Sequence, residues 1–499
     1  MKACSVSPSN RVLLVYPGSF TNLFPEIPLP LLYLGWALGR EGYDVEVLDA
    51  RIQDYRKVDF SRYLLVGVST MTGSMIRDAI KIAARARTHC PDVPLVWGGI
   101  HPSLLPEQTL SHPLVDIVVR GEGEMTLVEL ANSLRDGTGL EKVKGIVFMR
   151  EGRTFTTEPR DFIDLNRIDI ELPYHLLKMD RYKYVGFPVH TSRGCPYRCG
   201  FCYNTSFHRR QWRSKSAERV LDEVSYVIRR FGTREICFGW EDEFFISLKR
   251  IRLLCEGLLR RGLKIRWWSF CRFDNFARID DDLLGLMERS GCWSLSFGGE
   301  SGSQRILDEV IHKDIKLEQV LRATERLAKT QIRQIVSFMS GLPGETREDL
   351  RKTFQLIDRL SNINRNVYFN GIVMYTPYPG TPLFSRISKQ FGYQMPGSLD
   401  AWGNFEIFRD PGNIWHSGPY VRMCKTISLL TRFPFWYDGF KLKDVKDVIG
   451  GGRLKRPPFN VIYFLFARIA RFRWKKRLFH FPLEWKILEW VLKRVRGYV

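Results

Sequence analysis

The stretch TSRGCPYRCGFCYN, residues 191–204, carries three cysteines in the spacing C-x3-C-x2-C. Cys195, Cys199 and Cys202 follow a predicted strand and are close enough to bind three irons of one [4Fe–4S] cluster, which leaves the fourth iron open. An open iron suits a cluster that binds a substrate, whereas electron-transfer clusters and structural zinc sites usually have four protein ligands. The alternatives are a zinc knuckle or three buried structural cysteines. No fourth zinc ligand is obvious, because the nearest downstream histidine, His208, suits a surface position equally well.

About six strand–helix repeats surround this motif, between residues 186 and 390. The predicted strands include VHTSRG, EICFGW, WSLSFGG and IVSFMSG, and polar residues follow each of them. Repeats of this kind predict an α/β fold with a partial (β/α)6 barrel, whose catalytic residues lie at the carboxyl ends of the strands.

The region upstream, residues 1–145, alternates short apolar strands with helical stretches, as in RVLLVYP, DVEVLDA, LLVGVST and PLVWGG. This alternation predicts an open, parallel, Rossmann-like sheet, which binds ligands at the carboxyl ends of its strands. We expect a nucleotide-like or tetrapyrrole-like cofactor along Pro17, Ser69, Thr70, Gly98, Gly99, Gly121, Glu122, Gly123 and Glu124.

Two further regions complete the predicted organisation. Residues 146–185 combine most of a short strand pair, GIVFMREGRTFTTEP, with an extended passage punctuated by proline and acidic residues, which predicts a linker. Residues 391–499 lose the strand–helix rhythm, so we expect a mainly helical C-terminal region there. Between residues 441 and 499, 16 Lys and Arg residues stand against four Asp and Glu residues, which makes this region strongly basic.

The composition limits the class of protein. A chain of 499 residues is long enough for two or three domains, and its net charge of +22 indicates an anionic partner: nucleic acid, a membrane surface or a phosphate-bearing substrate. Its ten cysteines, with no signal-peptide pattern at the start, indicate a reducing cytosol. No apolar run approaches the roughly 18 residues that span a bilayer. We therefore expect a cytoplasmic protein.

Taken in order, the motifs resemble those of the radical S-adenosylmethionine superfamily, in the branch with an N-terminal cobalamin-binding domain. The resemblance spans roughly residues 11 to 385. It rests on PLPLLYLGWALGREGYDVEVLDA, VWGGIHPSLLPE, RGEGE, GCPYRCGFC, EDEFF, FGGESGSQRIL, GLPGETRED and YTPYPGTPL. The resemblance implies a [4Fe–4S] cluster, S-adenosylmethionine and cobalamin as cofactors, and an external electron donor such as flavodoxin or ferredoxin. Reductive cleavage of S-adenosylmethionine then yields a 5′-deoxyadenosyl radical that abstracts a substrate hydrogen.

The resemblance also implies roles for individual residues. Phe201 matches an aromatic position that packs near the bound nucleoside, and the alternative is ordinary loop packing. Glu241, Asp242 and Glu243 match the place where the family contacts the methionine amine, although three adjacent acids could equally be a solvated strand end. Glu300, in the run FGGESGS, matches a position that hydrogen-bonds the ribose.

Three points about this resemblance stay open. A helix N-cap by Ser301 or Ser303 is compatible with the ribose role of Glu300. We expect residues 341–346 and 378–381 to shape the rim of the site, primarily in a structural role. The motif D-x-H-x-x-G is absent, so if cobalamin binds, its cobalt is not held by that histidine. The competing interpretation is a relict Rossmann-like domain.

The leading functional hypothesis is a radical methyltransferase that acts on an unactivated carbon of a hydrophobic or lipid-like metabolite. Two S-adenosylmethionine molecules would serve it, one as methyl donor to cobalamin and one as radical source. The alternatives are a cobalamin-assisted oxidative cyclase or rearranging enzyme, resembling the anaerobic Mg-protoporphyrin ester cyclase, and a non-catalytic, membrane-associated, metal-binding scaffold. A methylthiotransferase acting on tRNA needs three further cysteines upstream of the motif, where only Cys4 and Cys90 occur.

The C-terminal stretch from residue 459 to 499 interleaves aromatic and aliphatic residues with Lys and Arg at helical spacing, as around Trp485 and Lys486. Such a basic amphipathic helix can lie on an anionic membrane, which would make the protein peripheral at the inner face of the membrane. The alternative is a helix that packs on the barrel with its basic face in water. We do not expect a nucleic-acid partner.

Overall fold

The computed structural model describes residues 10–18, 25–182, 184–239, 243–405, 413–431, 459–480 and 486, with the side chains of 459–465 and 467 excepted. The chain divides into two compact units. The first contains residues Met1–Cys237 and Pro377–Pro411, and the second contains Phe238–Thr376 and Gly412–Val499. Each unit is described by itself.

The first unit is built on a seven-stranded sheet of order β2-β1-β3-β4-β5-β6-β7. Strands β1 to β5 are parallel, and β6 and β7 form an antiparallel hairpin that pairs with β5. The strands are β1 Arg11–Tyr16, β2 Asp44–Asp49, β3 Leu65–Ser69, β4 Leu95–Gly98, β5 Ile117–Val119, β6 Ile146–Arg150 and β7 Arg153–Thr156. The four central residues of β1 are buried, which explains its unbroken apolar run, VLLV.

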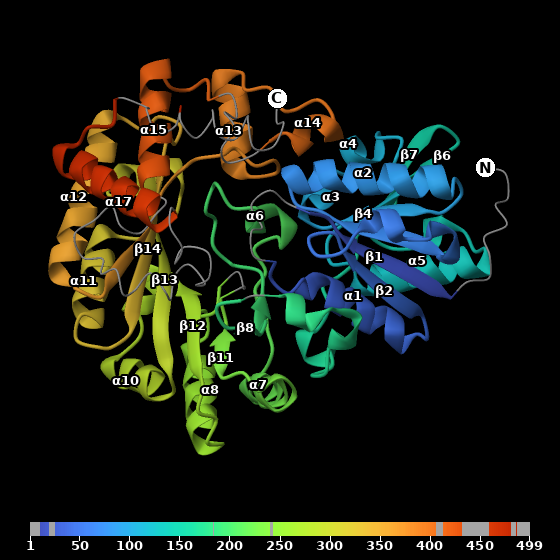
Figure 1. The fold of residues 1–499 in the computed structure, drawn as a ribbon, viewed down its shortest axis with the longest axis horizontal. Coiled ribbons are helices and arrows are strands. Elements are labelled where there is room, and N and C mark those ends of the chain that lie inside the picture. The colour runs from blue at the N-terminus through green and yellow to red at the C-terminus, as the bar shows by residue number, and fades with distance from the viewer. Residues whose placement is uncertain are drawn as a thin grey trace. The chain divides into compact units, whose positions relative to one another are not determined.

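Helices lie on both faces of this sheet, with α2, α3 and α4 on one face and α1 and α5 on the other (Figure 1). Their bounds are α1 Leu29–Arg40, α2 Ser74–His89, α3 Ile100–Leu104, α4 Pro106–Leu110 and α5 Glu124–Asp136. Short helical turns cover Tyr55–Lys57, Phe60–Arg62, Leu140–Lys142, Leu165–Arg167, Tyr174–Leu176 and Met179–Arg181. Parallel sheets that helices cover on both faces bind ligands at the carboxyl ends of their strands. Ser69 and Gly98, predicted from the sequence as cofactor residues, end β3 and β4 at that edge.

The remainder of the first unit carries the cysteine motif. Strands β8 and β11 pair in parallel, and β9 and β10 pair antiparallel. The elements are β8 Phe187–Pro188, β9 Ser192–Arg193, α6 Asn204–Phe207, β10 Arg213–Ser214, α7 Ala217–Phe231, β11 Glu235–Cys237, α13 Pro382–Phe391 and α14 Leu399–Gly403. Helix α7 begins where the Ser216 hydroxyl accepts a hydrogen bond from Arg219 N.

The second unit repeats strand and helix in sequence, and β12, β13, β14 and β15 are parallel neighbours in that order. Its helices α10, α11 and α12 lie along these strands (Figure 1). The elements are α8 Leu248–Arg260, β12 Arg266–Cys271, α9 Phe273–Ala277, α10 Asp281–Arg289, β13 Cys292–Glu300, a π-helical turn Ile306–Val310, α11 Leu317–Leu327, β14 Arg333–Ser340, α12 Arg347–Ile363, β15 Val367–Met374, α15 Gly418–Leu430 and α17 Phe459–Lys476. The parallel strand–helix repeat confirms the predicted α/β class.

Helix α17 belongs to the basic C-terminal region and packs on α12. The Trp474 ring meets the Phe354 ring edge-on at 5.1 Å, and Phe479 packs against both. Phe472 and Ile469, by contrast, are 57% and 46% exposed. Of the helices that the structure describes, none has the length and apolar character to span a bilayer. The predicted helix around Trp485 falls outside the described residues, apart from Lys486.

Candidate functional site

The cysteine loop runs from β9 to α6. Cys199 is buried, while Cys195 and Cys202 are partly exposed, and Cys202 N donates to Cys199 O at 3.1 Å. Gly194, just before the loop, has φ +81°, and a side chain there would collide with the backbone oxygen of Gln211. In the described ranges, no three His, Cys, Asp or Glu side chains are already arranged as metal ligands. The assignment of the three cysteines therefore rests on their spacing and on the affinity of thiolates for iron.

A second segment of the first unit packs between the cysteine loop and α3. Leu383 N donates to Gly200 O at 2.7 Å, and the Ser206 hydroxyl donates to Gly380 O. Gly380 has φ +71°, and a Cβ atom there would lie 2.8 Å from the Leu104 side chain. The run YTPYPGTPL thus needs glycine at this point, because both its conformation and its neighbour exclude a side chain.

The ligand edge of the first sheet gathers several predicted cofactor residues. Thr70 N donates to Gly98 O at 2.9 Å, beside Ser69 at the end of β3. Gly99 has φ +97°, and a Cβ atom there would lie 2.6 Å from Thr70 O. Gly121, at the end of the neighbouring strand, has open space where a Cβ would stand. The edge is therefore a backbone-lined surface that a large ligand can approach closely.

His101 is a residue of this edge that the sequence did not assign. It is completely buried, and its Nδ1 lies 3.0 Å from the Thr72 hydroxyl. Burial lowers its pKa to about 4, so the ring is neutral near pH 7. The His101 ring meets the Trp402 ring edge-on, with 5.5 Å between the ring centroids. The signal that could have found it is its place in the quoted run VWGGIHPSLLPE.

Two buried atoms at this edge have no hydrogen-bond partner among the described residues: His101 Nε2 and Thr70 Oγ1. Buried polar atoms are rarely left unbonded in native proteins, so such atoms mark a place for a polar ligand or water. Together with the side-chain-free surface at Gly98 and Gly99, they fit a large cofactor rich in amide groups, as cobalamin is.

Glu122 and Glu124, also predicted at this edge, lie in buried ion pairs. Arg193 approaches Glu122 at 3.1 Å and Glu124 at 2.7 Å, and Arg213 approaches Glu122 at 2.7 Å. Burial alone would raise the pKa of Glu122, but Arg193 and Arg213 outweigh burial and hold it below its usual value. The predicted cofactor contact of these two carboxylates remains a prediction.

In the second unit, Glu243 is buried beyond the end of β11. Its Oε1 accepts hydrogen bonds from Asn275 Nδ2 at 3.0 Å and from Phe245 N at 3.2 Å. Burial raises the pKa of Glu243 to about 7, against the smaller opposing effect of Arg272. Its predicted companions, Glu241 and Asp242, lie outside the described residues.

Glu300 ends β13 with φ +56°, an uncommon conformation for a residue with a side chain. Lys313 Nζ donates to Glu300 Oε1 at 2.7 Å, which neutralises the carboxylate in a buried site. Ser303 N donates to the Ser301 hydroxyl at 3.1 Å, and the Ser303 hydroxyl donates to Asp349 at 2.6 Å. The two serines therefore order the turn after Glu300, and Lys313 is a partner that the sequence did not reveal.

The segment predicted as rim, residues 341–346, surrounds a buried carboxyl group. Glu345 Oε2 accepts from Gly341 N at 2.6 Å and from the Tyr420 hydroxyl at 2.9 Å. Its Oε1 is buried without a partner among the described residues. Burial raises the pKa of Glu345 to about 8, so this group is mostly protonated at neutral pH. Trp415 Nε1 donates a hydrogen bond to Gly341 O at 2.9 Å, next to this carboxyl group.

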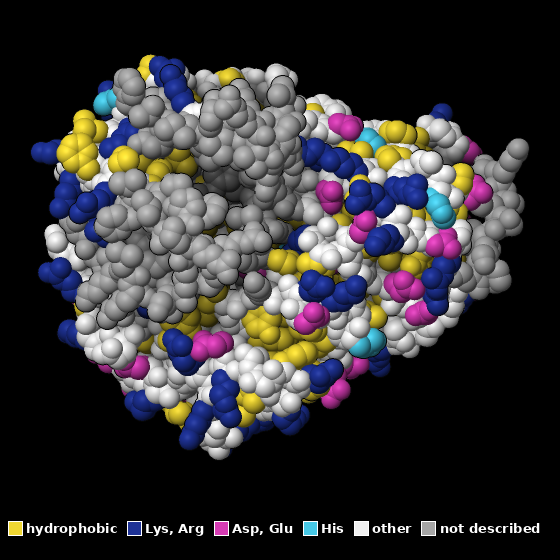
Figure 2. Space-filling view, in the orientation of Figure 1, with side chains coloured by type: hydrophobic (Ala, Val, Ile, Leu, Met, Phe, Trp, Pro, Cys, Tyr) yellow, Lys and Arg dark blue, Asp and Glu magenta, His cyan; other side chains and the backbone are white. Residues whose placement is uncertain are grey.

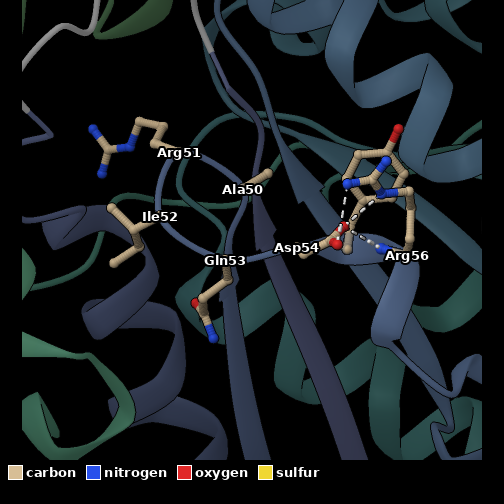
Figure 3. A pocket seen from close by; sticks show the side chains of 7 residues that line it. Ala50, Arg51, Ile52, Gln53, Asp54 and Arg56 are labelled. Atoms are coloured by element: carbon tan, nitrogen blue, oxygen red, sulfur yellow. Dashed lines mark hydrogen bonds and ion pairs between the residues drawn. The ribbon is translucent and has the colours of Figure 1, made fainter.

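Two pockets in the first unit are lined entirely by residues that the structure describes. One, of about 370 Å³, is lined by residues 50–56 after β2. Figure 3 shows Asp54 paired with Arg56 on one side of it and Arg51 pointing away from that pair. Arg51 is itself held by Asp49 at 2.6 Å, so both arginines of this pocket already have carboxylate partners. The other, of about 190 Å³, lies between α3, Gly121 and α6.

Comparison with known proteins places two family models on the chain. The model described as "Radical SAM superfamily" matches residues 189–357, and the model described as "B12 binding domain" matches residues 22–131. The first range includes the cysteine loop, and the second covers strands β2 to β5 of the first sheet, with the edge at Thr70, Gly98 and His101.

Individual relatives agree with these matches. The chain is 34% identical over 390 residues to "Uncharacterized methyltransferase PH0819" of Pyrococcus horikoshii, covering 75% of this chain and 82% of the relative. It is 28% identical over 401 residues to the "Anaerobic magnesium-protoporphyrin IX monomethyl ester cyclase" of Rubrivivax gelatinosus, covering 76% and 70%. Among solved structures, the cobalamin-dependent S-adenosylmethionine radical enzyme OxsB, with aqua-cobalamin and S-adenosylmethionine bound, matches with a TM-score of 0.73 and 19% identity, covering 98% of this chain and 75% of that one.

Proposed function

Because the chain belongs to the cobalamin-dependent radical S-adenosylmethionine methyltransferases, we propose that it transfers a methyl group to an unactivated carbon of a hydrophobic metabolite. Its cofactors are a [4Fe–4S] cluster, S-adenosylmethionine and cobalamin. The observation that carries the proposal is that the cysteine loop and the ligand edge of the B12-binding sheet lie in one compact unit.

The bound cofactors would supply radical formation and methyl transfer, and the chain would hold them in place. Cys195, Cys199 and Cys202 would ligate three irons. Thr70 and the unsubstituted backbone at Gly98 and Gly99 would face cobalamin, because Thr70 Oγ1 is buried there without a partner among the described residues. A side chain at Gly99 would displace Thr70. This assignment follows the domain division proposed from the sequence, with residues 1–145 for cobalamin, 146–185 as linker, 186–390 as barrel and 391–499 as C-terminal region.

S-adenosylmethionine would take the remaining predicted positions. Phe201 would pack near its nucleoside, Glu300 would reach its ribose, and Glu243, with Glu241 and Asp242, would receive its methionine amine. Lys313 and Asn275 would hold two of these carboxyl groups in place, because each donates a hydrogen bond to one of them in the structure. An external electron donor such as flavodoxin or ferredoxin would reduce the cluster.

Helix α17 supports a lipid-like substrate. Phe472, Ile469 and Leu478 are exposed on this helix or just beyond it, next to the basic residues Lys475 and Lys476. Exposed apolar side chains beside lysines are typical of helices that lie on anionic membranes, where a lipid-like substrate would also be found. On the right-hand, described part of the face in Figure 2, Lys and Arg are interspersed with Asp and Glu.

The experiment uses S-adenosylmethionine with a deuterated methyl group. The anaerobically reconstituted, full-length protein is incubated with a lipid extract, a reductant and cobalamin, and products are analysed by mass spectrometry. We expect a lipid product that carries the intact deuterated methyl group and forms only with cobalamin. A product altered without gaining the label would instead favour the oxidative cyclase, which the similarity to the Rubrivivax cyclase makes the second candidate.

A further inference from the structure

A buried group of ion pairs joins the ligand edge of the first sheet to the strand that enters the cysteine loop. Glu122 and Glu124 follow β5, and Arg193 ends β9, two residues before Cys195. Arg193 lies 3.1 Å from Glu122 Oε1 and 2.7 Å from Glu124 Oε1. The three side chains are 14%, 8% and 6% exposed, so solvent screens these contacts little.

A second arginine holds the same carboxylate from the neighbouring strand. Arg193 and Arg213 stand opposite each other in the β9–β10 pair. Arg213 donates to Glu122 Oε1 at 2.7 Å and to Ile163 O at 3.0 Å, and Ile163 N donates to Glu122 Oε2 at 3.0 Å. Glu122 therefore contacts the strand before the cysteine loop and the strand after it. It also accepts a hydrogen bond from the extended segment at Ile163.

Arg193 also contacts the first helix of the B12-binding region. Its guanidinium carbon lies 4.7 Å from the centre of the Tyr33 ring in α1, a distance that gives a cation–π attraction. His190 stacks on the same ring at 5.9 Å. The Arg193 guanidinium group therefore contacts both the glutamates that follow β5 and the Tyr33 ring in α1.

Buried ion pairs of this kind add little to stability, because the cost of removing charges from water offsets most of their attraction. What they do provide is geometry, since the planar guanidinium group binds two carboxylates only in fixed directions. A reaction shared between two cofactors depends on such geometry, because a misplacement of about 1 Å can lower a rate by about 100-fold.

We propose that Arg193 is a positioning residue that fixes the cysteine loop against the ligand edge of the B12-binding sheet and so sets the separation of cluster and cobalt. This inference rests on the proposed function, because it takes Cys195, Cys199 and Cys202 as the cluster ligands. It goes beyond that function in assigning the spacing of the two cofactors to Arg193, Glu122 and Glu124.

The test measures the distance between the reduced cluster and Co(II) by pulsed EPR in the full-length, anaerobically reconstituted protein, since both centres are then paramagnetic. Arg193→Lys keeps a cation but loses the forked geometry, and Glu124→Gln removes one charged partner. We expect both variants to retain iron and cobalamin and to give a broadened or shifted distance distribution. If Arg193→Lys loses a cofactor, its distance distribution cannot be measured. The distance distribution of Glu124→Gln then tests the proposal.

The matched control is Glu223→Gln. Glu223 forms an equally buried ion pair with Lys215, at 2.5 Å with both side chains 4% exposed, and the pair joins α7 to the residue after β10. Lys215 also lies 6.0 Å from the centre of the Tyr33 ring, so the control keeps this contact to α1 while Glu122 and Glu124 stay unchanged. We expect its distance distribution to equal that of the wild type. A wild-type distribution in Glu124→Gln, or an equal broadening in Glu223→Gln, would overturn the proposal. Retention of the cluster signal in Cys199→Ala would separately overturn the ligand assignment.

Discussion

The Tyr420 hydroxyl donates a hydrogen bond of 2.9 Å to the buried carboxyl group of Glu345. The same carboxyl oxygen accepts from Gly341 N at 2.6 Å. Burial nevertheless dominates, and the pKa of Glu345 is raised to about 8. The turn after β14 is therefore built around an acid that stays protonated at neutral pH.

This raised pKa predicts a pH dependence of stability. Between the unfolded-state pKa, near 4.5, and about 8, the unfolded chain releases the proton while the folded chain keeps it. The stability is thus full below pH 4.5 and falls as the pH rises toward 8. Glu345→Gln removes this dependence, so its free energy of unfolding relative to that of the wild type should rise between pH 5 and pH 8, by a few kcal/mol at most.

Urea unfolding of both proteins at several pH values checks this prediction. Tyr420→Phe serves as the companion variant, because loss of its hydrogen bond should raise the pKa of Glu345 further and so extend the fall in stability to higher pH. Parallel pH profiles for wild type and Glu345→Gln would show that Glu345 ionises normally in the folded protein.

Cys199→Ala should abolish the iron–sulfur absorption and the formation of 5′-deoxyadenosine, because two thiolates hold a cubane cluster poorly. The matched control is Cys255→Ala, in α8, a buried cysteine whose pKa burial raises to about 12 and which therefore makes a poor ligand. Iron content, absorption spectra and 5′-deoxyadenosine are measured for both. Equal loss in the two variants would mean that the cysteine loop has no special role.

Gly99→Ala should weaken cobalamin binding and cost about 1–3 kcal/mol of stability, because φ is +97° and the new Cβ would lie 2.6 Å from Thr70 O. Gly39→Ala is the control, since Gly39 lies in α1 with nothing within 4 Å of its Cβ position. It should leave binding unchanged and stabilise by up to about 1 kcal/mol. Spectroscopic titration with hydroxocobalamin compares the two, and undiminished affinity in Gly99→Ala would place the cofactor elsewhere.

Two side chains at the end of α17 should behave differently. Trp474 packs against Phe354 and is 6% exposed, so Trp474→Ala should destabilise the protein by about 3–5 kcal/mol. Phe472 is 57% exposed, so Phe472→Ser should change stability by about 0.5 kcal/mol or less. If the helix docks on membranes, Phe472→Ser should reduce sedimentation with anionic phosphatidylglycerol vesicles. Unchanged sedimentation would contradict that part of the proposal.

The elements of the fold could be predicted where the pattern is local. The runs RVLLVYP and LLVGVST predicted the strands Arg11–Tyr16 and Leu65–Ser69. The pair GIVFMREGRTFTTEP was also predicted as two strands. Its pairing with β5 was not, because the partner of an edge strand depends on contacts between distant segments.

The site was predictable only in part, for the same reason. Spacing alone indicated the cysteines, and position after a strand indicated Thr70 and Glu122. The partners of these residues were hidden, since Arg193 lies 71 residues from Glu122 in sequence. His101 contacts Trp402, which lies in the C-terminal region that the sequence predicted only as mainly helical. Buried polar atoms without partners, such as His101 Nε2, become visible only once the chain is folded.

The most direct test of methyl transfer does not need the substrate. The full-length protein, reconstituted anaerobically with iron, sulfide and a reductant, is given S-adenosylmethionine with and without hydroxocobalamin. S-adenosylhomocysteine and 5′-deoxyadenosine are then quantified by mass spectrometry. The account predicts both products, with S-adenosylhomocysteine formed only when cobalamin is present. Formation of 5′-deoxyadenosine with no cobalamin-dependent S-adenosylhomocysteine would contradict it.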